Sequence, residues 1–264
     1  MSGALARLLR RFGRRRPIDL FNALAHDGPL WAVGDIHGCL DLYLTLEARI
    51  AAEAEASGRP QTVVVLGDMI DRGPRVKETL DHLRAEPPGG IVRTCLMGNH
   101  EDMLLRFLDR PGENRAWLSF GAWPTLGSYG VSPDPAVPQQ DPVRLATELG
   151  AAMGAGTRAF LDGLPIGLTS GPFVLCHAGT APETPLARQT RHDLMWARHG
   201  EVGDLRPPPD LGDRIVVHGH VPVDTPVFDR WRINVDTGAF ATGRLTAVRL
   251  AAGEPPRFIT TGRP

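Results

Sequence analysis

The chain has 264 residues, 42% of them hydrophobic, which is enough for one large domain with a buried core. Its 29 basic and 30 acidic residues leave a formal net charge of −1, so the composition gives no general attraction to nucleic acid. Lys77 is the single lysine, and it precedes a glutamate and follows no Gly-rich loop. This excludes a nucleotide-binding loop of the Walker A type.

Cysteine spacing and hydropathy indicate the cellular compartment in which the protein is expected. Cys39, Cys95 and Cys176 are widely spaced and form no Cys-x-x-Cys pair, so neither a disulfide framework nor a thiolate zinc site is indicated. No stretch approaches the roughly 20 apolar residues of a membrane span, and no secretory leader is evident. We expect a soluble protein with no transmembrane segment in a reducing, cytoplasmic setting.

Residues 1–27 form a basic N-terminal extension in this interpretation. Six arginines lie between Arg7 and Arg16, and no acidic residue occurs before Asp19. A solvated arm is favoured over a contact with an anionic surface or a partner, because charge runs at chain ends are usually solvated.

From Pro29 onward, a strand, a polar turn and a helix follow one another three times. Strands are expected over 29–33, 62–66 and 91–97, and helices over 40–56, 76–85 and 102–108. Asp35 and Asp68 are 33 residues apart, and Asp68 and Asn99 are 31 apart, which is the length of a βαβ unit. The pattern predicts parallel strands, with the polar turns at their carboxyl ends, where ligands gather in such sheets.

The second half of the chain has a different pattern. Residues 111–165 begin rich in glycine, proline and tryptophan and end in one or two expected helices, so we interpret them as a helical insertion that shapes substrate access, with a purely packing role as the alternative. Four β-rich runs follow, which are expected to form a second sheet or to complete the first: 173–179, 214–220, 232–238 and 244–250. The long connection between the first two runs contains an expected helix at 192–198.

Six short polar motifs each follow an apolar run. They are GDIHG (34–38), GDMIDRG (67–73), GNHE (98–101), CHAG (176–179), HGH (218–220) and NVDTG (234–238). A lone Asp or His at a strand end is usually a turn former, but six ordered motifs are not explained in that way. Aspartate, histidine and asparagine supply oxygen and nitrogen ligands for divalent metals, and glycine permits the tight turns that present them.

These side chains are suited to a pair of metal ions. Two cations about 3.5–4 Å apart need a shared anionic ligand, and Asp68 on the middle strand is the expected bridge. The other expected ligands are Asp35 and His37 at the first ion, and Asn99, His177 and His220 at the second. Other phosphatase chemistries lack their motifs, because no cysteine is followed six residues later by arginine and no Asp-x-Asp pair exists. The mechanism that remains is direct attack on the phosphate by a metal-activated water.

The motifs GDxHG, GDxxDRG and GNHE, followed by HAG and GH, make the chain resemble the metal-dependent phosphoprotein phosphatases of the calcineurin-like metallophosphoesterase superfamily. The resemblance runs from Trp31 to Leu250 and is strongest to the bacterial and phage serine/threonine phosphatases. It implies an α/β fold, a calcineurin-like four-layer α/β/β/α sandwich, over residues 28–253, with 254–264 as a C-terminal tail. It also implies two divalent metal ions at strand C-terminal ends, with Mn²⁺ expected and iron or zinc as alternatives.

The resemblance carries roles over to individual residues. The family's metal ligands fall on the same six positions: Asp35, His37, Asp68, Asn99, His177 and His220. His100 matches the general acid, Asp71 its carboxylate partner, and Arg72 and Arg198 the arginines that bind phosphate. An imidazolium is suited to protonate a poor alkoxide leaving group, and a guanidinium fork matches two phosphate oxygens.

The resulting expectation is a phosphatase acting on phosphoserine or phosphothreonine in a phosphoprotein or phosphopeptide, with no specific nucleic acid partner. Its rival within the same chemistry is a dinucleoside polyphosphate hydrolase, which resembles the family in the same motifs. A hypothesis of another class is a catalytically inactive module that binds phosphorylated partners. Lost ligands or a lost His100 would indicate such a module, and both are retained in this sequence.

Overall fold

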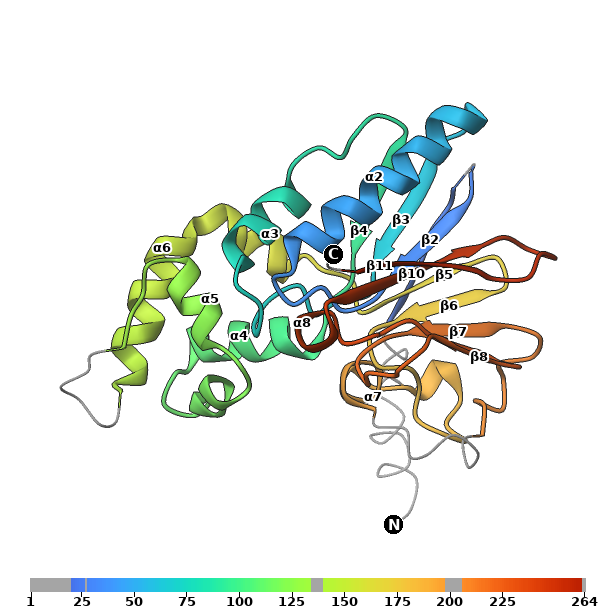
Figure 1. The fold of residues 1–264 in the computed structure, drawn as a ribbon. Helices are drawn as coiled ribbons and strands as arrows, with labels where there is room; N and C mark the ends of the chain where they lie inside the picture. The colour runs from blue at the N-terminus through green and yellow to red at the C-terminus, as the bar shows by residue number, and fades with distance from the viewer. Residues whose placement is uncertain (1–19, 27, 134–139, 198–205, 263–264) are drawn as a thin grey trace, which may run out of the picture.

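Two β-sheets packed face to face form the centre of the molecule, with helices outside them (Figure 1). The computed structural model describes residues 20–26, 28–133, 140–197 and 206–262. This arrangement is the predicted α/β/β/α sandwich.

The first sheet has five strands in the order β11-β10-β2-β3-β4. The three predicted strands β2 (Leu30–Val33), β3 (Gln61–Val65) and β4 (Ile91–Cys95) are parallel neighbours, which confirms the βαβ interpretation. β10 (Arg244–Leu250) runs antiparallel beside β2, so the last of the four β-rich runs completes this sheet.

The second sheet has six strands in the order β1-β5-β6-β7-β9-β8. The other three β-rich runs supply β6 (Phe173–Cys176), β7 (Ile215–His218) and β9 (Arg232–Asn234), which are parallel to one another. Their motifs therefore leave the sheet at one edge. The remaining strands are β1 (Phe21–Ala23), β5 (Gly167–Ser170) and β8 (Val227–Asp229).

Two edge strands lie outside the predicted catalytic range of residues 28–253. β1 lies within the supposed extension 1–27 and pairs with β5, and β11 (Arg257–Gly262) lies within the supposed tail 254–264 and pairs antiparallel with β10. Each is an edge strand with one neighbour, so its sequence carries little of the apolar pattern that marks a central strand. Residues 21–23 and 257–262 therefore belong to the sandwich.

The strands bury side chains on both faces, with a period of two. Leu30 and Ala32 of β2 point into the core between the sheets, where they join Val64 and Val217, whereas Trp31 belongs to the outer cluster. A central parallel strand that is buried on both faces reads as a continuous apolar run, which is why these strands are visible in the sequence.

Helices that follow the strands form the outer layers. α2 (Leu40–Ser57) and α3 (Val76–Arg84) connect the parallel strands, and α2 packs on the first sheet. α7 (Arg191–Trp196) lies beneath the second sheet in Figure 1, and the N–H of Ala178 donates to the carbonyl of Leu194 at 2.8 Å. α7 is thereby tied to the CHAG turn.

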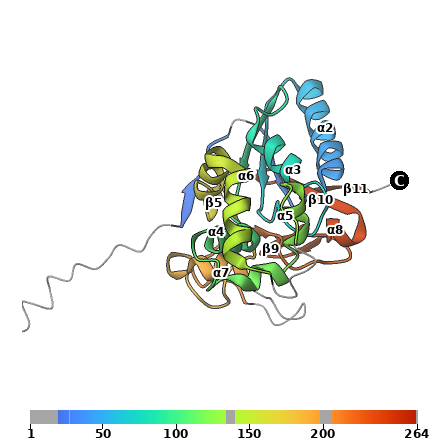
Figure 2. The ribbon, with the colours of Figure 1, turned by 90° about the vertical axis from the view of Figure 1, so that its left-hand side faces the viewer.

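The helical insertion lies on one side of the molecule, beside α4 (Asn99–Asp109), as the two ribbon views show (Figures 1 and 2). It contains the 3₁₀ helix η1 (Arg115–Ser119), α5 (Trp123–Ser128) and α6 (Pro142–Asp162). α6 is interrupted at Gly154, whose φ is 71°, and this break explains a pattern that reads as one or two helices. Two short helices complete the description: η2 (Leu186–Arg188) and α8 (Ala239–Thr242).

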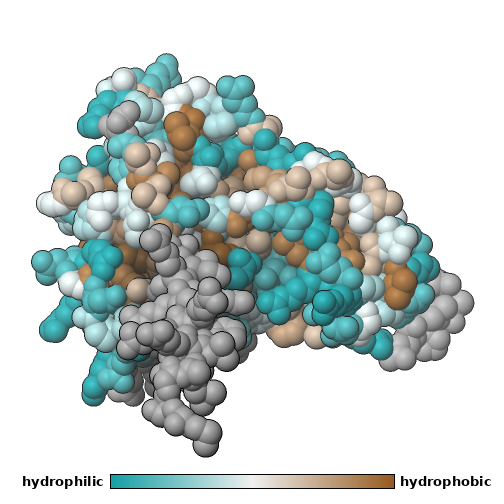
Figure 3. All heavy atoms as spheres, turned by 180° about the vertical axis from the view of Figure 1, so that it is seen from behind, coloured by the Kyte–Doolittle hydropathy of each residue, from teal (hydrophilic) through white to brown (hydrophobic). Residues whose placement is uncertain are grey.

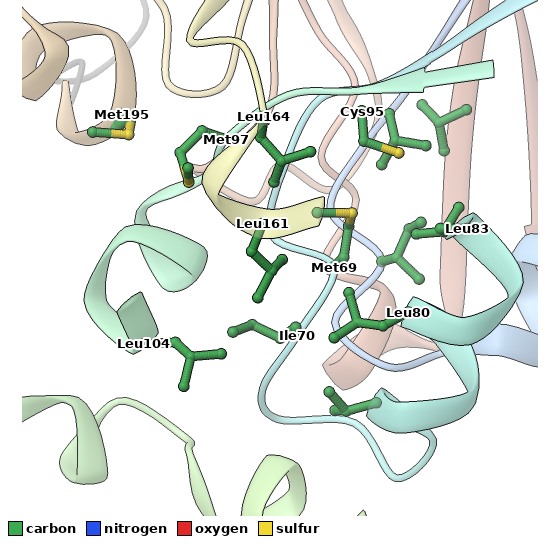
Figure 4. Packing of buried hydrophobic residues seen from close by; sticks show 14 of the residues in the cluster. Met69, Ile70, Leu80, Leu83, Cys95, Met97, Leu104, Leu161, Leu164 and Met195 are labelled. Carbon is green, nitrogen blue, oxygen red and sulfur yellow. The ribbon is translucent and has the colours of Figure 1, made fainter. Parts of the chain in front are cut away.

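The insertion packs against the turn that follows β3. Figure 4 shows Met69 and Ile70 of the GDMIDRG motif between Leu80 of α3 and the side chains of Leu104 in α4 and Leu161 in α6. Met69 and Ile70 are adjacent in the chain and lie between the polar residues Asp68 and Asp71. The apolar part of the turn is therefore anchored in the core while the polar part is left for the site.

The surface of the described residues carries both hydrophilic and hydrophobic side chains. Hydrophobic side chains on the face shown in Figure 3 occur as separate patches among hydrophilic ones. None of the helices in the described residues is both long enough and apolar enough for a membrane crossing.

Candidate functional site

The polar motifs meet where the parallel strands of both sheets end. Five of the predicted ligands are buried, each at most 3% exposed: Asp35, His37, Asp68, Asn99 and His177. His220 is partly exposed. Six residues from both halves of the chain thus gather in one region, as the motif spacing predicts.

The turns that carry these residues have unusual backbone conformations. Positive φ angles occur at His37 (43°), Asp68 (47°), Asp71 (67°), Arg72 (67°) and His220 (71°). Left-handed conformations of non-glycine residues cost of order 1–3 kcal/mol each and persist only where the surroundings enforce them. The site therefore needs supporting contacts.

Glu101 supplies one such support, and the sequence analysis gave this residue no role. Its carboxylate accepts hydrogen bonds from the backbone N–H groups of Asp68 (2.9 Å), Met69 (2.8 Å), Ile70 (3.3 Å) and Gly98 (3.0 Å). Glu101 is fully buried in the first turn of α4, and three of its four partners lie more than 30 residues away, so the local sequence did not indicate this role. Glu101 fixes the turn that presents Asp68.

A first group of possible metal ligands consists of His37, Asp68 and His100, whose ligand atoms lie within 4.8 Å of one another. Nδ1 of His37 donates to the carbonyl of Ile70 at 2.6 Å, so Nε2 faces Asp68 Oδ2 at 3.6 Å. Burial lowers the pKa of His37 to about 3, which keeps this imidazole neutral. A neutral histidine whose second nitrogen is held by a carbonyl is suited to bind a metal.

A second group consists of Asp68, His177 and His220. His177 Nδ1 donates to the carbonyl of Leu66 at 2.9 Å, and its Nε2 lies 3.4 Å from Asp68 Oδ1. The same Nε2 lies 2.9 Å from Asn99 Oδ1 and 3.2 Å from His220 Nδ1. Asp68 thus presents Oδ2 to the first group and Oδ1 to the second, as a bridging carboxylate would.

Asp35 lies outside both groups of three. Its Oδ1 accepts a hydrogen bond from the backbone N–H of His220 at 3.2 Å. Burial, and then the carboxylate of Asp236, raise the pKa of Asp35 well above its usual value, and burial raises that of Asp236 to about 6. Several buried carboxylates beside imidazoles are a ligand set that fits divalent cations, because a cation offsets the cost of burying their charge. Asp236 also shapes the last turn by accepting from the N–H of Gly238 at 2.8 Å.

The predicted acid and its partner are in direct contact. His100 Nδ1 donates to Asp71 Oδ2 at 2.6 Å. The two terminal nitrogens of Arg72 lie 3.1 Å from His37 Nε2 and 3.0 Å from His100 Nε2, so the guanidinium reaches into the same region. Arg198, the other predicted phosphate ligand, lies outside the described residues.

Gly98 is expected to be required for this geometry. A Cβ at this position would overlap Asp68 Oδ1 and the backbone nitrogen of Asp68. We expect Gly98→Ala to lower the free energy of unfolding by about 1–3 kcal/mol and to reduce activity, because the Asp68 turn must shift. Denaturant unfolding measures the first effect. In contrast, Gly150→Ala within α6 meets only ordinary contacts and is expected to stabilise by about 0.5–1 kcal/mol. Equal stabilities of the two variants would contradict this account.

Comparison with known proteins gives one family match and similar proteins of two kinds. Residues 28–243 match the family model described as calcineurin-like phosphoesterase. The chain is 28% identical over 225 residues to serine/threonine-protein phosphatase 2 of Salmonella typhimurium, covering 84% of this chain and 92% of that protein. It is 27% identical over 234 residues to the asymmetrical bis(5'-nucleosyl)-tetraphosphatase PrpE of Geobacillus thermodenitrificans, covering 82% and 88%.

A similar solved structure is that of a candidate diadenosine tetraphosphatase. Its TM-score is 0.62 at 19% identity, and the match covers 92% of this chain and 97% of the other, which shows a shared fold. The family match spans all six motifs up to the turn after β9 and includes both histidine groups. The chain therefore belongs to the calcineurin-like phosphoesterase family.

Proposed function

We propose that this protein is a metal-dependent serine/threonine protein phosphatase. Its family membership makes it a phosphoester hydrolase, and the family uses a dinuclear divalent metal site. The observation that carries the proposal is the position of Asp68, whose two oxygens face two separate histidine groups. A single carboxylate between two such groups is the arrangement that a pair of cations requires.

We propose one set of ligands for each ion. Asp35, His37 and Asp68 would hold the first, and Asp68 would share the second with Asn99, His177 and His220. When bound, the two cations lower the pKa of water and stabilise the charge on the phosphoryl oxygens. Mn²⁺ is the proposed metal, and iron and zinc suit the same oxygen and nitrogen donors.

The chain's own residues perform the remaining steps. Arg72 binds two phosphate oxygens through its fork, for which its position between His37 and His100 is suitable. His100 protonates the leaving oxygen, and its bond to Asp71 orients the ring. Because the attacking water replaces the alkoxide directly, no residue forms a covalent bond with phosphate.

The proposed substrate is a phosphorylated serine or threonine in a protein. The similarity to the Salmonella phosphatase and the motif forms GDMIDRG and GNHE support it. Dinucleoside polyphosphate hydrolysis is the second candidate, and the similarity to the Geobacillus tetraphosphatase favours it.

Parallel assays distinguish the two candidates. We expect the Mn²⁺-loaded protein to hydrolyse phosphoserine and phosphothreonine peptides with a kcat/KM at least about tenfold above that for diadenosine tetraphosphate, because the ratio of these constants measures discrimination between substrates. An Asp68→Asn preparation controls for contaminating phosphatases, since both activities should disappear in it. A preference for the dinucleotide would refute the proposed substrate but not the proposed metal site.

A further inference from the structure

We infer that the segment from η1 to α5 positions the acid of the reaction, because Trp117 and Thr125 hold the carboxylate of Asp71 and, through it, the ring of His100. The inference rests on the proposed role of His100. It gives the helical insertion a part in the chemistry in addition to the predicted shaping of substrate access.

Three side chains donate to the two oxygens of Asp71. Trp117 Nε1–H donates to Oδ2 at 2.8 Å, and the hydroxyl of Thr125 donates to Oδ1 at 2.5 Å. His100 Nδ1 donates to Oδ2 at 2.6 Å. The backbone N–H of Asp71 in turn donates to the Thr125 oxygen at 3.0 Å. Thr125 therefore bonds both the backbone and the side chain of the same residue.

Burial makes these contacts decisive for the orientation of Asp71. Asp71 and Thr125 are 0% exposed and Trp117 is 1% exposed, so solvent does not replace a lost donor. A carboxylate held at both oxygens has one orientation in its pocket, whereas one held only by His100 could rotate about its side-chain bonds. The Trp117 ring is itself fixed, since it packs against Phe107 with 4.9 Å between ring centroids.

The same segment also holds the backbone that carries Asp71. The carbonyl of Gly121 accepts a hydrogen bond from the N–H of Arg72 at 2.8 Å. Asp71 and Arg72 both have φ near 67°, a conformation that needs support from outside the turn. Gly121 has φ 97°, and a Cβ there would come within 2.7 Å of Arg72 Cγ, so the approach requires glycine. The segment from η1 to α5 thus holds both Asp71, which is the partner of His100, and the neighbouring Arg72.

Loss of the two donors should affect protonation of the leaving group more than binding. A good leaving group departs without a proton, whereas a basic one needs the acid. We therefore expect Trp117→Phe and Thr125→Val to reduce kcat about 10- to 100-fold for phenyl phosphate, within the range that general acid catalysis contributes. For p-nitrophenyl phosphate we expect a loss below about threefold, with KM unchanged for both substrates.

Matched variants separate positioning from general damage. Trp123→Phe removes an indole from the same segment at a position that is 39% exposed, and it should behave as wild type. Thr125→Ser keeps the hydroxyl and should restore the phenyl phosphate rate. Equal losses on both substrates, or failure of the serine variant to restore the rate, would overturn the inference.

A second measurement does not depend on turnover. In zinc-loaded protein labelled with ¹⁵N-histidine, which avoids paramagnetic broadening by Mn²⁺, the Nδ1 proton of His100 should give a downfield signal, because it is buried and donates to a carboxylate. We expect this signal to shift or broaden in Trp117→Phe and Thr125→Val and to persist in Trp123→Phe. An unchanged signal in the first two variants would overturn the positioning role. A wild-type protein that shows the signal but hydrolyses neither aryl phosphate would instead reject the proposed function.

Discussion

Replacing Asp68 by asparagine is expected to reduce kcat on p-nitrophenyl phosphate by at least about 1,000-fold, since charge stabilisation by both cations depends on this residue. The substitution removes the only negative charge that both histidine groups share in the described structure. Asparagine tolerates the left-handed conformation that Asp68 adopts, with φ 47°, so the backbone of the turn is retained. The loss should therefore report on the metals and not on folding. Metal content by mass spectrometry and kcat are the two measurements.

Two controls accompany this variant. Asp81→Asn makes the same chemical change at an exposed helix position, where the lost ion-pair partners are Lys77 and Arg84, and it should leave activity and metal content unchanged. Wild-type protein treated with a chelator should lose activity and regain it on addition of Mn²⁺. An Asp68→Asn protein that retains two tightly bound metals and substantial activity would refute the bridging role.

Replacing His100 by asparagine is expected to reduce kcat on a phosphoserine peptide by about 10²- to 10⁴-fold, the usual contribution of a general acid. The loss on p-nitrophenyl phosphate should be much smaller, because its leaving group needs no proton. Burial disfavours the imidazolium, but the carboxylate of Asp68 and then the hydrogen bond to Asp71 outweigh it and raise the pKa of His100. The acid must be protonated, so the wild-type rate should fall as pH rises through this raised pKa, and the variant should lack that decline.

Metal content decides between two roles for His100. The structure places it in the first group of possible ligands as well as beside Asp71, with its Nε2 3.8 Å from Asp68 Oδ2. A general acid can be removed without loss of a metal ion, whereas a ligand cannot. Two metals per chain in His100→Asn, together with the selective loss on the peptide, would support the acid. One metal per chain, with equal losses on both substrates, would show that His100 binds a cation instead.

The sequence predicted the central strands of the fold better than the edges. β2 and β3 are buried along their whole length, whereas β4 lies at the edge of the first sheet and exposes Val92 by 58%. The spacing of the motifs after the three strands indicated their parallel pairing. β1 and β8 have three residues each and lie at the edges of the second sheet, so no pattern marks them. Whether 244–250 joined the first sheet or a second one depended on long-range pairing, which a local pattern does not contain.

The site shows the same division between local and long-range information. The predicted ligands occur in motifs with fixed spacing, and the structure brings them to one region, although their individual roles stay predictions. The supporting contacts join distant residues: Trp117 and Thr125 lie 46 and 54 positions from Asp71, and Glu101 lies 33 from Asp68. Tryptophan and threonine are common in cores, so their sequence context gave no reason to connect them with Asp71.

The left-handed backbone of the site has a consequence for how this protein can evolve. Five of the seven non-glycine residues with positive φ in the described part of the chain belong to the site: His37, Asp68, Asp71, Arg72 and His220. Glycine at any of these positions would relieve steric strain and remove a reactive side chain in one step. If these turns perform the proposed chemistry, selection for heat resistance alone would favour inactive descendants, so stability and activity would be opposed at these positions.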